Sequence, residues 1–211
     1  MKSVLITGGT VRLGKAIAER LRADGWRVLT SSHRADAGAD IVADLSEPMG
    51  AAKLFAAALQ ALGGNPPDAL VNNAGLFTGD AAVIKAVNLE APKKLVMMMA
   101  GRETGMGAVV NILDAGIGDQ GSGIGGEYLA SKRELAAFTQ AGAMMFAATL
   151  RMNGVAPGPV MAPTGVHVKA GEMLLAHRPT AEDVAAAVAF LLSAEATTGC
   201  IVPVDGGQGM V

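Results

Sequence analysis

Residues 3–14 read SVLITGGTVRLG, and this stretch decides the fold. It begins with a short apolar run, typical of a buried strand, and passes directly into a glycine-rich turn. Leu13, Ile17 and Leu21 then recur every fourth residue, which is the spacing of one face of an amphipathic helix. A strand, a glycine turn and a helix in this order are typical of the first unit of a doubly wound fold, where the turn meets a dinucleotide pyrophosphate.

The same alternation continues along the rest of the chain. It implies right-handed crossovers and a parallel sheet covered on both faces. We therefore predict one α/β domain over residues 1–211, a Rossmann-type, doubly wound parallel sheet with helices on both faces. The expected strands are residues 3–7, 27–31, 40–43, 69–72, 108–112, 149–155 and 200–204, and the later helices 47–62, 83–100, 127–146 and 180–193.

Composition excludes several classes of protein. Hydrophobic residues make up 51% of the chain and charged residues 17%, which excludes disorder, and no apolar run approaches the roughly 20 residues of a membrane helix. A net charge of −2 lacks the basic footprint of a nucleic-acid binder. The single Cys200 and the short apolar part of residues 1–7 favour a cytoplasmic protein. The three histidines lack metal-ligand spacing, so no metal is expected.

The end of the second predicted strand indicates which dinucleotide binds. An acidic residue there would bond the ribose 2′-hydroxyl of NAD, but the chain has Ser31, Ser32, His33 and Arg34. The hydroxyls and the guanidinium suit a 2′-phosphate, and Arg12 in the glycine turn would approach it from the other side, so we expect NADP(H). A solvated surface charge is the alternative for either arginine alone.

Tyr128 and Lys132 lie four residues apart on a predicted helix and therefore project from one face. An ammonium beside a phenol lowers the pKa of the phenol and makes it a usable proton donor. Tyr128 is the only tyrosine, and it follows a glycine-rich loop at 116–126 after a predicted strand, where open sheets place their sites. Asp114 ends that strand. Its carboxylate would orient Tyr128 or bind a substrate amino group, with a turn cap as the alternative.

Several motifs occur in a characteristic order along essentially the whole chain. They are the turn at residues 7–14, Asn-Asn-Ala-Gly at 72–75, Asn88 in VNLEAP, Tyr128 with Lys132, Asn-Gly-Val-Ala-Pro-Gly at 153–158 and Asp-Gly-Gly at 205–207. In this order they resemble the short-chain dehydrogenase/reductase family. The resemblance implies that residues 72–75 line the cofactor, that Asn88 holds a proton-relay water and that Lys132 also binds the nicotinamide ribose. It further implies a homotetramer or homodimer.

Residue pattern and resemblance together define the expected cofactor site. Asp44 and Leu45, after the third predicted strand, suit the adenine edge, although Asp44 could equally cap the next helix. The full set of expected cofactor contacts is Gly8, Thr10, Arg12, Leu13, Gly14, Ser32, His33, Arg34, Asp44, Leu45, Asn73, Ala74, Gly75, Tyr128, Lys132, Pro157 and Gly158.

Two departures from the general family pattern narrow the resemblance. Arg12 stands where most members have a third turn glycine, and Asp114 stands where most have a serine. Both resemble the pteridine reductases and the related dihydromonapterin reductases, which share the pair His33 and Arg34 and place an aromatic ring at the position of Phe77. The flat face of such a ring suits a flat heterocycle, and a phenylalanine buried under the loop is the alternative.

The resemblance implies an NADPH-dependent reduction of a pterin-type substrate. Hydride would pass to C6 of a dihydropterin and a proton from Tyr128 to N5. The expected catalytic residues are Asp114, Tyr128, Lys132 and Asn88, and the expected substrate contacts are Phe77, Asp114 and Tyr128. The alternatives are a carbonyl reductase of the same family, acting on a small ketone or an oxoacyl thioester, and a non-catalytic cofactor-binding protein.

The predicted segment over the substrate is short, with little more than twenty residues between Gly158 and the last helix. Which pterin, folate or carbonyl compound binds therefore stays open, because the residues that set the pocket lie there: Met161, Val166, His167, Met173 and His177. The twelve methionines, including 97–99 and 144–145, are interpreted as helix-packing residues or as a helix surface shared in an oligomer.

Overall fold

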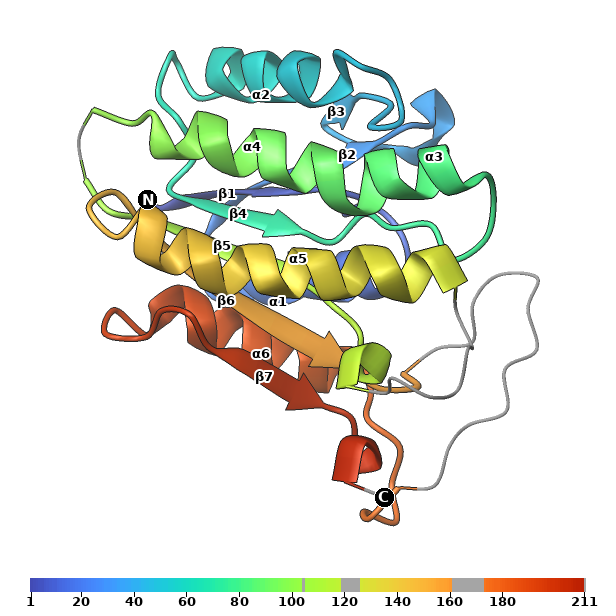
Figure 1. Ribbon diagram of the computed structural model, residues 1–211. Helices are drawn as coiled ribbons and strands as arrows, with labels where there is room; N and C mark the ends of the chain where they lie inside the picture. Colours follow the sequence, from blue (N-terminus) through green and yellow to red (C-terminus); the bar gives the residue numbers. More distant parts are fainter. Residues whose placement is uncertain (104, 119–125, 161–172, 211) are drawn as a thin grey trace.

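A computed structural model of the chain describes residues 1–103, 105–118, 126–160 and 173–210. Within these ranges one seven-stranded sheet has the order β3-β2-β1-β4-β5-β6-β7, and all neighbouring strands run parallel (Figure 1). The doubly wound parallel sheet is confirmed, and no strand boundary differs from its prediction by more than two residues. The strands are β1 (Ser3–Ile6), β2 (Arg27–Ser32), β3 (Ile41–Val42), β4 (Ala69–Asn72), β5 (Gly107–Ile112), β6 (Leu150–Pro157) and β7 (Ile201–Val204).

Helices cover both faces of the sheet, α2, α4 and α5 on one and α1 and α6 on the other (Figure 1). The α-helices are α1 (Arg12–Ala23), α2 (Gly50–Ala61), α3 (Ala81–Lys85), α4 (Ala91–Ala100), α5 (Gly126–Met145) and α6 (Ala181–Ser193). The described residues also contain four helical turns that are not α-helical, η1 (Ala35–Ala37), η2 (Ala86–Glu90), η3 (Ala115–Gly118) and η4 (Gln208–Met210). The helix expected at 83–100 is thus three segments, because a π turn, η2, joins α3 to α4. Thr180 caps α6 through a reciprocal capping box with Asp183.

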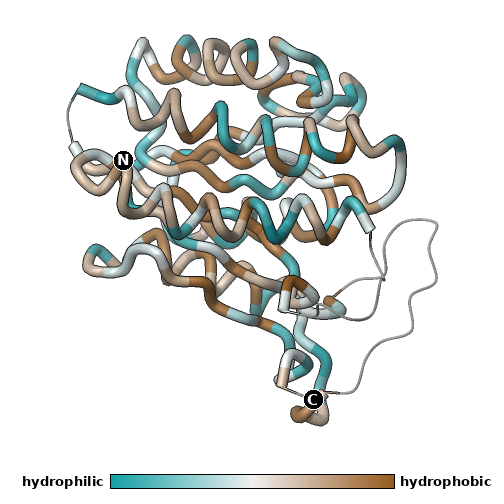
Figure 2. The backbone as a smooth tube through the Cα atoms, in the orientation of Figure 1, coloured by the Kyte–Doolittle hydropathy of each residue, from teal (hydrophilic) through white to brown (hydrophobic). Residues whose placement is uncertain are grey.

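Strand alternation divides the core into two apolar layers. Leu5 packs with Leu70 and Val109 beneath α2 and α4, whereas its neighbours Val4 and Ile6 pack on the opposite face beneath α1 and α6. Both faces of β1 and β4 are therefore buried, which explains their continuous apolar sequences. The helices alternate between hydrophilic and hydrophobic residues, since only one face of each packs on the sheet (Figure 2).

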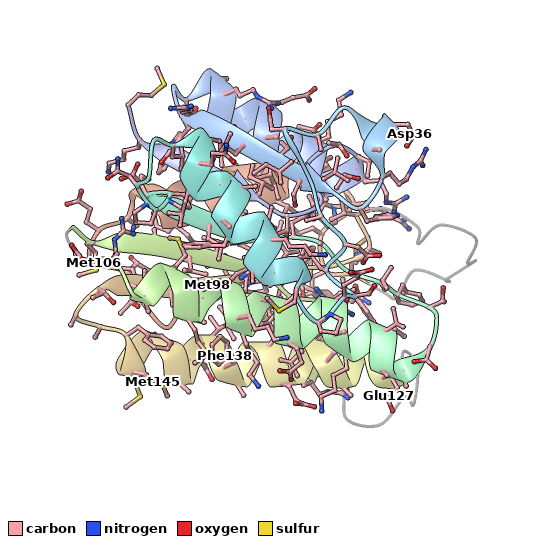
Figure 3. The ribbon with its side chains drawn as sticks, turned by 90° about the horizontal axis from the view of Figure 1, so that it is seen from above. Asp36, Met98, Met106, Glu127, Phe138 and Met145 are labelled. Carbon is pink, nitrogen blue, oxygen red and sulfur yellow. The ribbon has the colours of Figure 1, made fainter. Side chains whose placement is uncertain are left out.

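The interpretation as helix-packing residues holds for only some of the methionines. Met99 is fully buried on α4, as expected of a packing residue, whereas Met97, Met144 and Met145 are exposed. Met106 and Met145, labelled in Figure 3, lie at the periphery. Among the described helices, none is both long enough and apolar enough to cross a bilayer.

The order of the strands indicates which edge of the sheet binds ligands. The chain reverses direction across the sheet at β1 and β4, which lie side by side at its centre. In open parallel sheets, ligands bind in the crevice outside the carboxyl ends of the strands at this switch point. The carboxyl ends of β1, β4 and β5 lead directly into Thr7, Asn73 and Leu113, where the predicted site residues begin.

Candidate active site

The glycine turn after β1 is tied to the end of β4. Thr7 Oγ1 accepts hydrogen bonds from the N–H groups of Asn73 and Ala74, both at 3.0 Å. Asn73 Nδ2 donates in return to the carbonyl oxygens of Thr7 and Gly8, at 2.9 and 3.0 Å. A Cβ at Gly14 would overlap the Gly8 carbonyl oxygen, so the approach of helix to turn requires glycine there. These bonds bring two stretches of expected cofactor residues, 8–14 and 73–75, to one place.

The amino end of α1 is suited to an anion. Val11, its N-cap, makes no side-chain capping bond, and no acidic residue lies in the first turn. The first N–H groups of the helix and its partial positive charge are therefore left for a ligand such as a pyrophosphate. The expected contacts Thr10, Leu13 and Gly14 lie around this helix start.

Arg12 has an unusual backbone conformation. Its φ of 51° is the only positive value among the described residues other than glycine. A left-handed conformation costs an L-residue about 1–2 kcal/mol relative to glycine. Strain of this kind is concentrated at functional sites, and an arginine that tolerates it points to a use for its exposed guanidinium.

The end of β2 holds the second predicted phosphate ligand. Arg34 donates from Nε to Asp36 Oδ1 at 3.0 Å and from Nη2 to Asp36 Oδ2 at 2.7 Å. Ser32 Oγ accepts the N–H of Arg34 at 3.1 Å and so shapes the turn that presents the guanidinium. His33 and Arg34 are exposed. Asp36 was not among the predicted residues, although its place two residues after Arg34 is visible in the sequence.

The side chain of Asp44, after β3, does not cap α2, which was the alternative role expected for it. Its Oδ1 accepts the N–H and the hydroxyl of Ser46 at 2.8 and 2.7 Å, and these bonds hold the pKa of Asp44 below its usual value. The carboxylate thus closes a local turn before α2, whose N-cap is Met49. The Leu45 side chain packs in the core beneath α2. The contacts that Asp44 and Leu45 make are thus with other residues of the protein, and they do not by themselves indicate a ligand site.

Asp114 and Tyr128 are brought into direct contact. The Tyr128 hydroxyl donates to Asp114 Oδ2 at 2.7 Å, and the Gly116 N–H donates to Oδ1 at 2.8 Å. The carboxylate follows β5 and the phenol lies in the first turn of α5, so the contact joins the sheet edge to that helix. Asp114 therefore orients the phenol, while Gly116 holds the carboxylate in place.

Lys132 lies behind the phenol, one helical turn further along α5. Its Nζ donates to the Ile112 carbonyl oxygen at 2.7 Å and lies 5.8 Å from the centre of the Tyr128 ring. The side chain is only 4% exposed. Burial lowers the pKa of Lys132 to about 8, although the negative charge of Asp114 acts in the opposite direction. Lys132 is therefore still mostly charged at neutral pH, but it loses its proton at a lower pH than an exposed lysine does.

The expected lowering of the pKa of Tyr128 is wrong for this arrangement. Burial, followed by the charge and the hydrogen bond of Asp114, raises the pKa of Tyr128 well above its ordinary value instead of lowering it. The physical reasons are that burial disfavours the charged phenolate and that an adjacent carboxylate, which accepts a hydrogen bond from the hydroxyl, stabilises the neutral phenol. Tyr128 is consequently held as a protonated group, which can act as a donor.

An aromatic ring lies over this site. The Phe77 and Tyr128 rings have centroids 4.7 Å apart and planes tilted by 53°. Phe77 is half-buried and is not part of the apolar core, so it does not match the alternative of a residue buried under the loop. The loop after β4 thus places the Phe77 ring directly beside the hydroxyl-bearing ring of Tyr128.

Asn88 holds the loop that carries Phe77. Its Oδ1 accepts the Leu76 N–H at 2.8 Å, and its Nδ2 donates to the Leu76 carbonyl oxygen at 2.9 Å and to Ser131 Oγ at 3.1 Å. The fully buried amide is therefore used by protein partners, and a relay water on the amide itself would have to displace one of them. Ser131, which donates to the Tyr128 carbonyl oxygen at 2.6 Å, was not predicted, and a serine three residues after Tyr128 was its only sequence signal.

The remaining predicted residues lie apart from this centre or outside the described ranges. Pro157 ends β6, and the Gly158 N–H donates to the Val204 carbonyl oxygen at 2.9 Å, so both lie at the same carboxyl edge two strands beyond β4. Met161, Val166 and His167 lie outside the described residues. Within the described part of the chain, no three His, Cys, Asp or Glu side chains are placed to hold a metal ion.

The chain is similar to known proteins in both sequence and fold. A family model described as short chain dehydrogenase matches residues 2–173. Levodione reductase from Leifsonia aquatica is 32% identical, covering 97% of this chain and 93% of the relative. The 3-oxoacyl-[acyl-carrier-protein] reductase MabA from Mycobacterium tuberculosis is 30% identical, covering 99% and 93%. The solved structure of FolM alternative dihydrofolate reductase 1 from Brucella canis, complexed with NADP, has a TM-score of 0.85 at 28% identity and covers 100% of this chain and 95% of that one.

Proposed function

The chain belongs to the short-chain dehydrogenase/reductase family, and we propose that it is an NADP(H)-dependent oxidoreductase that reduces a dihydropterin or a closely related heterocycle. One observation carries the proposal. The carboxylate of Asp114 accepts a hydrogen bond from the Tyr128 hydroxyl at 2.7 Å, and the centroid of the Phe77 ring lies 4.7 Å from that of the same phenol. Donor, acceptor and stacking surface are thus arranged for a flat ring that carries both a reducible imine and amino groups.

The cofactor assignment is supported by features at both ends of its expected site. The uncapped amino end of α1 and the tight glycine turn fit a pyrophosphate, because no side chain blocks the approach. Arg12 and Arg34 suit a 2′-phosphate, and the residues directly after β2 are His33 and Arg34 instead of the acidic residue that would select NAD. The structural neighbour from Brucella canis was solved with NADP. When bound, NADPH supplies the hydride.

Tyr128 supplies the proton in the proposed reaction. The carbon of the C6–N5 imine gains the hydride, and N5 takes the proton from the Tyr128 hydroxyl, so that the imine becomes an amine and Tyr128 is left as a phenolate. The ammonium of Lys132, 5.8 Å from the ring, offsets the charge of that phenolate. Its bond to the Ile112 carbonyl oxygen keeps it in place.

Asp114 makes the proton transfer dependent on the substrate. While its carboxylate accepts the Tyr128 hydroxyl, the pKa of Tyr128 stays raised and the phenol is a weak acid. A substrate amino group that donates to Asp114 would offset the carboxylate charge and lower the pKa of Tyr128 towards its ordinary value. A pterin has such N–H donors beside its reducible ring, and a simple ketone has none.

A carbonyl reductase acting on a ketone or an oxoacyl thioester is the second candidate. Its support is that two relatives, the levodione reductase and the oxoacyl reductase, are named for carbonyl substrates. The same Tyr128 and Lys132 would serve that reaction. A ketone, however, would leave the charge of Asp114 facing a substrate with no donor, and this disfavours the second candidate.

Oxidation of NADPH, followed by its absorbance, separates these functions. The assay compares dihydrobiopterin, dihydromonapterin and dihydrofolate with a simple ketone and an oxoacyl thioester. We expect turnover of at least one pterin or folate and little of the carbonyl compounds. Turnover of the carbonyl compounds alone would establish the second candidate, and no turnover of any of them would contradict the proposed reaction.

A further inference from the structure

We propose that Asp36 competes with the 2′-phosphate of NADP(H) for the Arg34 guanidinium and so limits the preference of this protein for NADPH over NADH. The inference rests on the proposed use of NADP(H). It assigns a specificity-determining role to a residue that neither contacts the reacting atoms nor belongs to the motifs of the glycine turn.

The contact occupies one complete edge of the guanidinium. Nε and Nη2 of Arg34 each donate to a different oxygen of Asp36, at 3.0 and 2.7 Å. Arg34 is the residue before η1 and Asp36 is the middle residue of that turn, and the Ser32 hydroxyl fixes the backbone of Arg34 at 3.1 Å. The pairing is therefore built into a local turn. Figure 3 shows Asp36 at the periphery, well away from Glu127 at the start of α5.

The 2′-phosphate of NADP(H) would bind the same Arg34 guanidinium to which Asp36 is already bonded. Carboxylate and phosphate oxygens bind arginine in the same two-pronged geometry. If the phosphate takes the Nε and Nη2 edge, the bonds to Asp36 must break. If it takes the other edge, the phosphate charge lies close to an ionised carboxylate and is repelled. Both routes weaken the binding of NADPH, and neither affects NADH, which has no 2′-phosphate.

Asp36 remains charged under working conditions. The hydrogen bonds and the positive charge of Arg34, with a smaller contribution from His33, hold the pKa of Asp36 below its usual value. The next acidic residues along the chain have other partners, since Asp40 accepts hydrogen bonds from Thr30 and Asp44 from Ser46. Among the ion pairs of the described residues, Arg34 is paired only with Asp36.

The competition should be modest. The side chains of Arg34 and Asp36 are 62% and 71% exposed, and exposed ion pairs are weak because water screens them. We therefore expect Asp36 to adjust the cofactor preference and not to reverse it. An exposed pair of this strength corresponds to about a twofold to fivefold change in a dissociation constant.

The test measures binding of NADPH and NADH to the substrate-free protein by fluorescence titration. We expect Asp36→Asn to bind NADPH about twofold to fivefold more tightly and NADH with unchanged affinity. In the Arg34→Gln background, Asp36→Asn should not increase the affinity for NADPH, because the guanidinium for which the two groups compete is absent. The matched control is Asp24→Asn, which removes an exposed carboxylate paired with Arg20 at 2.9 Å at the far end of α1.

Each other outcome would overturn the inference. Weaker binding of NADPH by Asp36→Asn would mean that the carboxylate orients Arg34 for the phosphate. An equal gain for NADPH and NADH, or an equal gain in Asp24→Asn, would indicate a general effect of net charge, and an unchanged affinity would mean that there is no competition. Failure of the wild-type protein to bind NADPH would instead contradict the proposed cofactor, so the two failures are distinguishable.

Discussion

A carboxylate is bonded to a functional group at both ends of the proposed site, but the two pairs lie in different surroundings. Asp114 meets Tyr128 in a largely buried site, where its charge and burial together raise the pKa of the phenol. Asp36 meets Arg34 in an exposed turn, where both groups stay ionised. The same interaction therefore controls protonation at one end and only adjusts affinity at the other, because electrostatic interactions strengthen as water is excluded.

The largest expected effect follows from removing the proton donor at the buried end. In Tyr128→Phe we expect turnover to fall by about a hundredfold to ten-thousandfold, the usual contribution of a general acid, while affinity for NADPH changes little. Steady-state assays and a cofactor titration of the same preparation measure the two quantities. Full activity in this variant would exclude Tyr128 as the donor and remove the contrast between the two ends.

A second prediction concerns the influence of Asp114 on the phenol. Because Tyr128 is the only tyrosine in the chain, its ionisation can be followed directly by the ultraviolet absorbance of tyrosinate. We expect tyrosinate to form in the wild-type protein only at a pH above that of free tyrosine, and at a lower pH in Asp114→Asn. Asp36→Asn is the control and should leave this titration unchanged. Equal titrations of the wild-type protein and Asp114→Asn would show that burial alone determines the pKa of Tyr128.

A third prediction uses the buried lysine as a probe of stability. The pKa of Lys132 is lowered to about 8 in the folded protein from 10.5 in the unfolded chain. Between pH 8 and pH 10 the unfolded chain therefore binds the additional proton, and the free energy of unfolding should rise with pH, by on the order of 2 kcal/mol over this window. Above about pH 10 the raised pKa of Tyr128 acts with the opposite sign, because the unfolded chain then releases the tyrosine proton first.

Denaturant unfolding at several pH values measures this slope. Lys132→Met should lose most of it, because the variant has no group at this position to titrate. A wild-type stability that falls between pH 8 and pH 10, or a slope that survives in Lys132→Met, would contradict the assignment to Lys132.

The sequence predicts the framework of the molecule better than the electrostatics of its site. Continuous apolar runs that end near glycine or asparagine identify buried parallel strands. For this reason the predicted bounds of β1 and β4 lie within one residue of the observed bounds. The four-residue spacing of Tyr128 and Lys132 likewise places both on one face of α5. These properties are local, so they can be read from neighbouring residues.

The properties that sequence did not predict depend on distances between separate elements. The hydrogen bond from the Tyr128 hydroxyl to Asp114 depends on where β5 ends relative to α5. Together with burial, this contact raises the pKa of Tyr128, whereas the sequence predicted that it would be lowered. The π turn that carries Asn88 differs from an α-helix by the register of a few backbone bonds, to which hydrophobic periodicity is insensitive. The pairing of Arg34 with Asp36 involves two exposed side chains, and the hydrophobic pattern of the sequence carries no information on how exposed side chains are oriented.

The smallest expected effect concerns Arg12, at the exposed end of the proposed site. Its φ of 51° is a conformation that glycine adopts without strain, so Arg12→Gly should raise the free energy of unfolding by about 1 kcal/mol. If the guanidinium binds the 2′-phosphate, the same variant should bind NADPH less tightly and NADH with little change. Thermal unfolding without cofactor and titrations with both cofactors separate the two effects. A variant that gains stability and keeps its full preference for NADPH would leave the strained arginine without a ligand-binding role and would assign phosphate recognition to Arg34 alone.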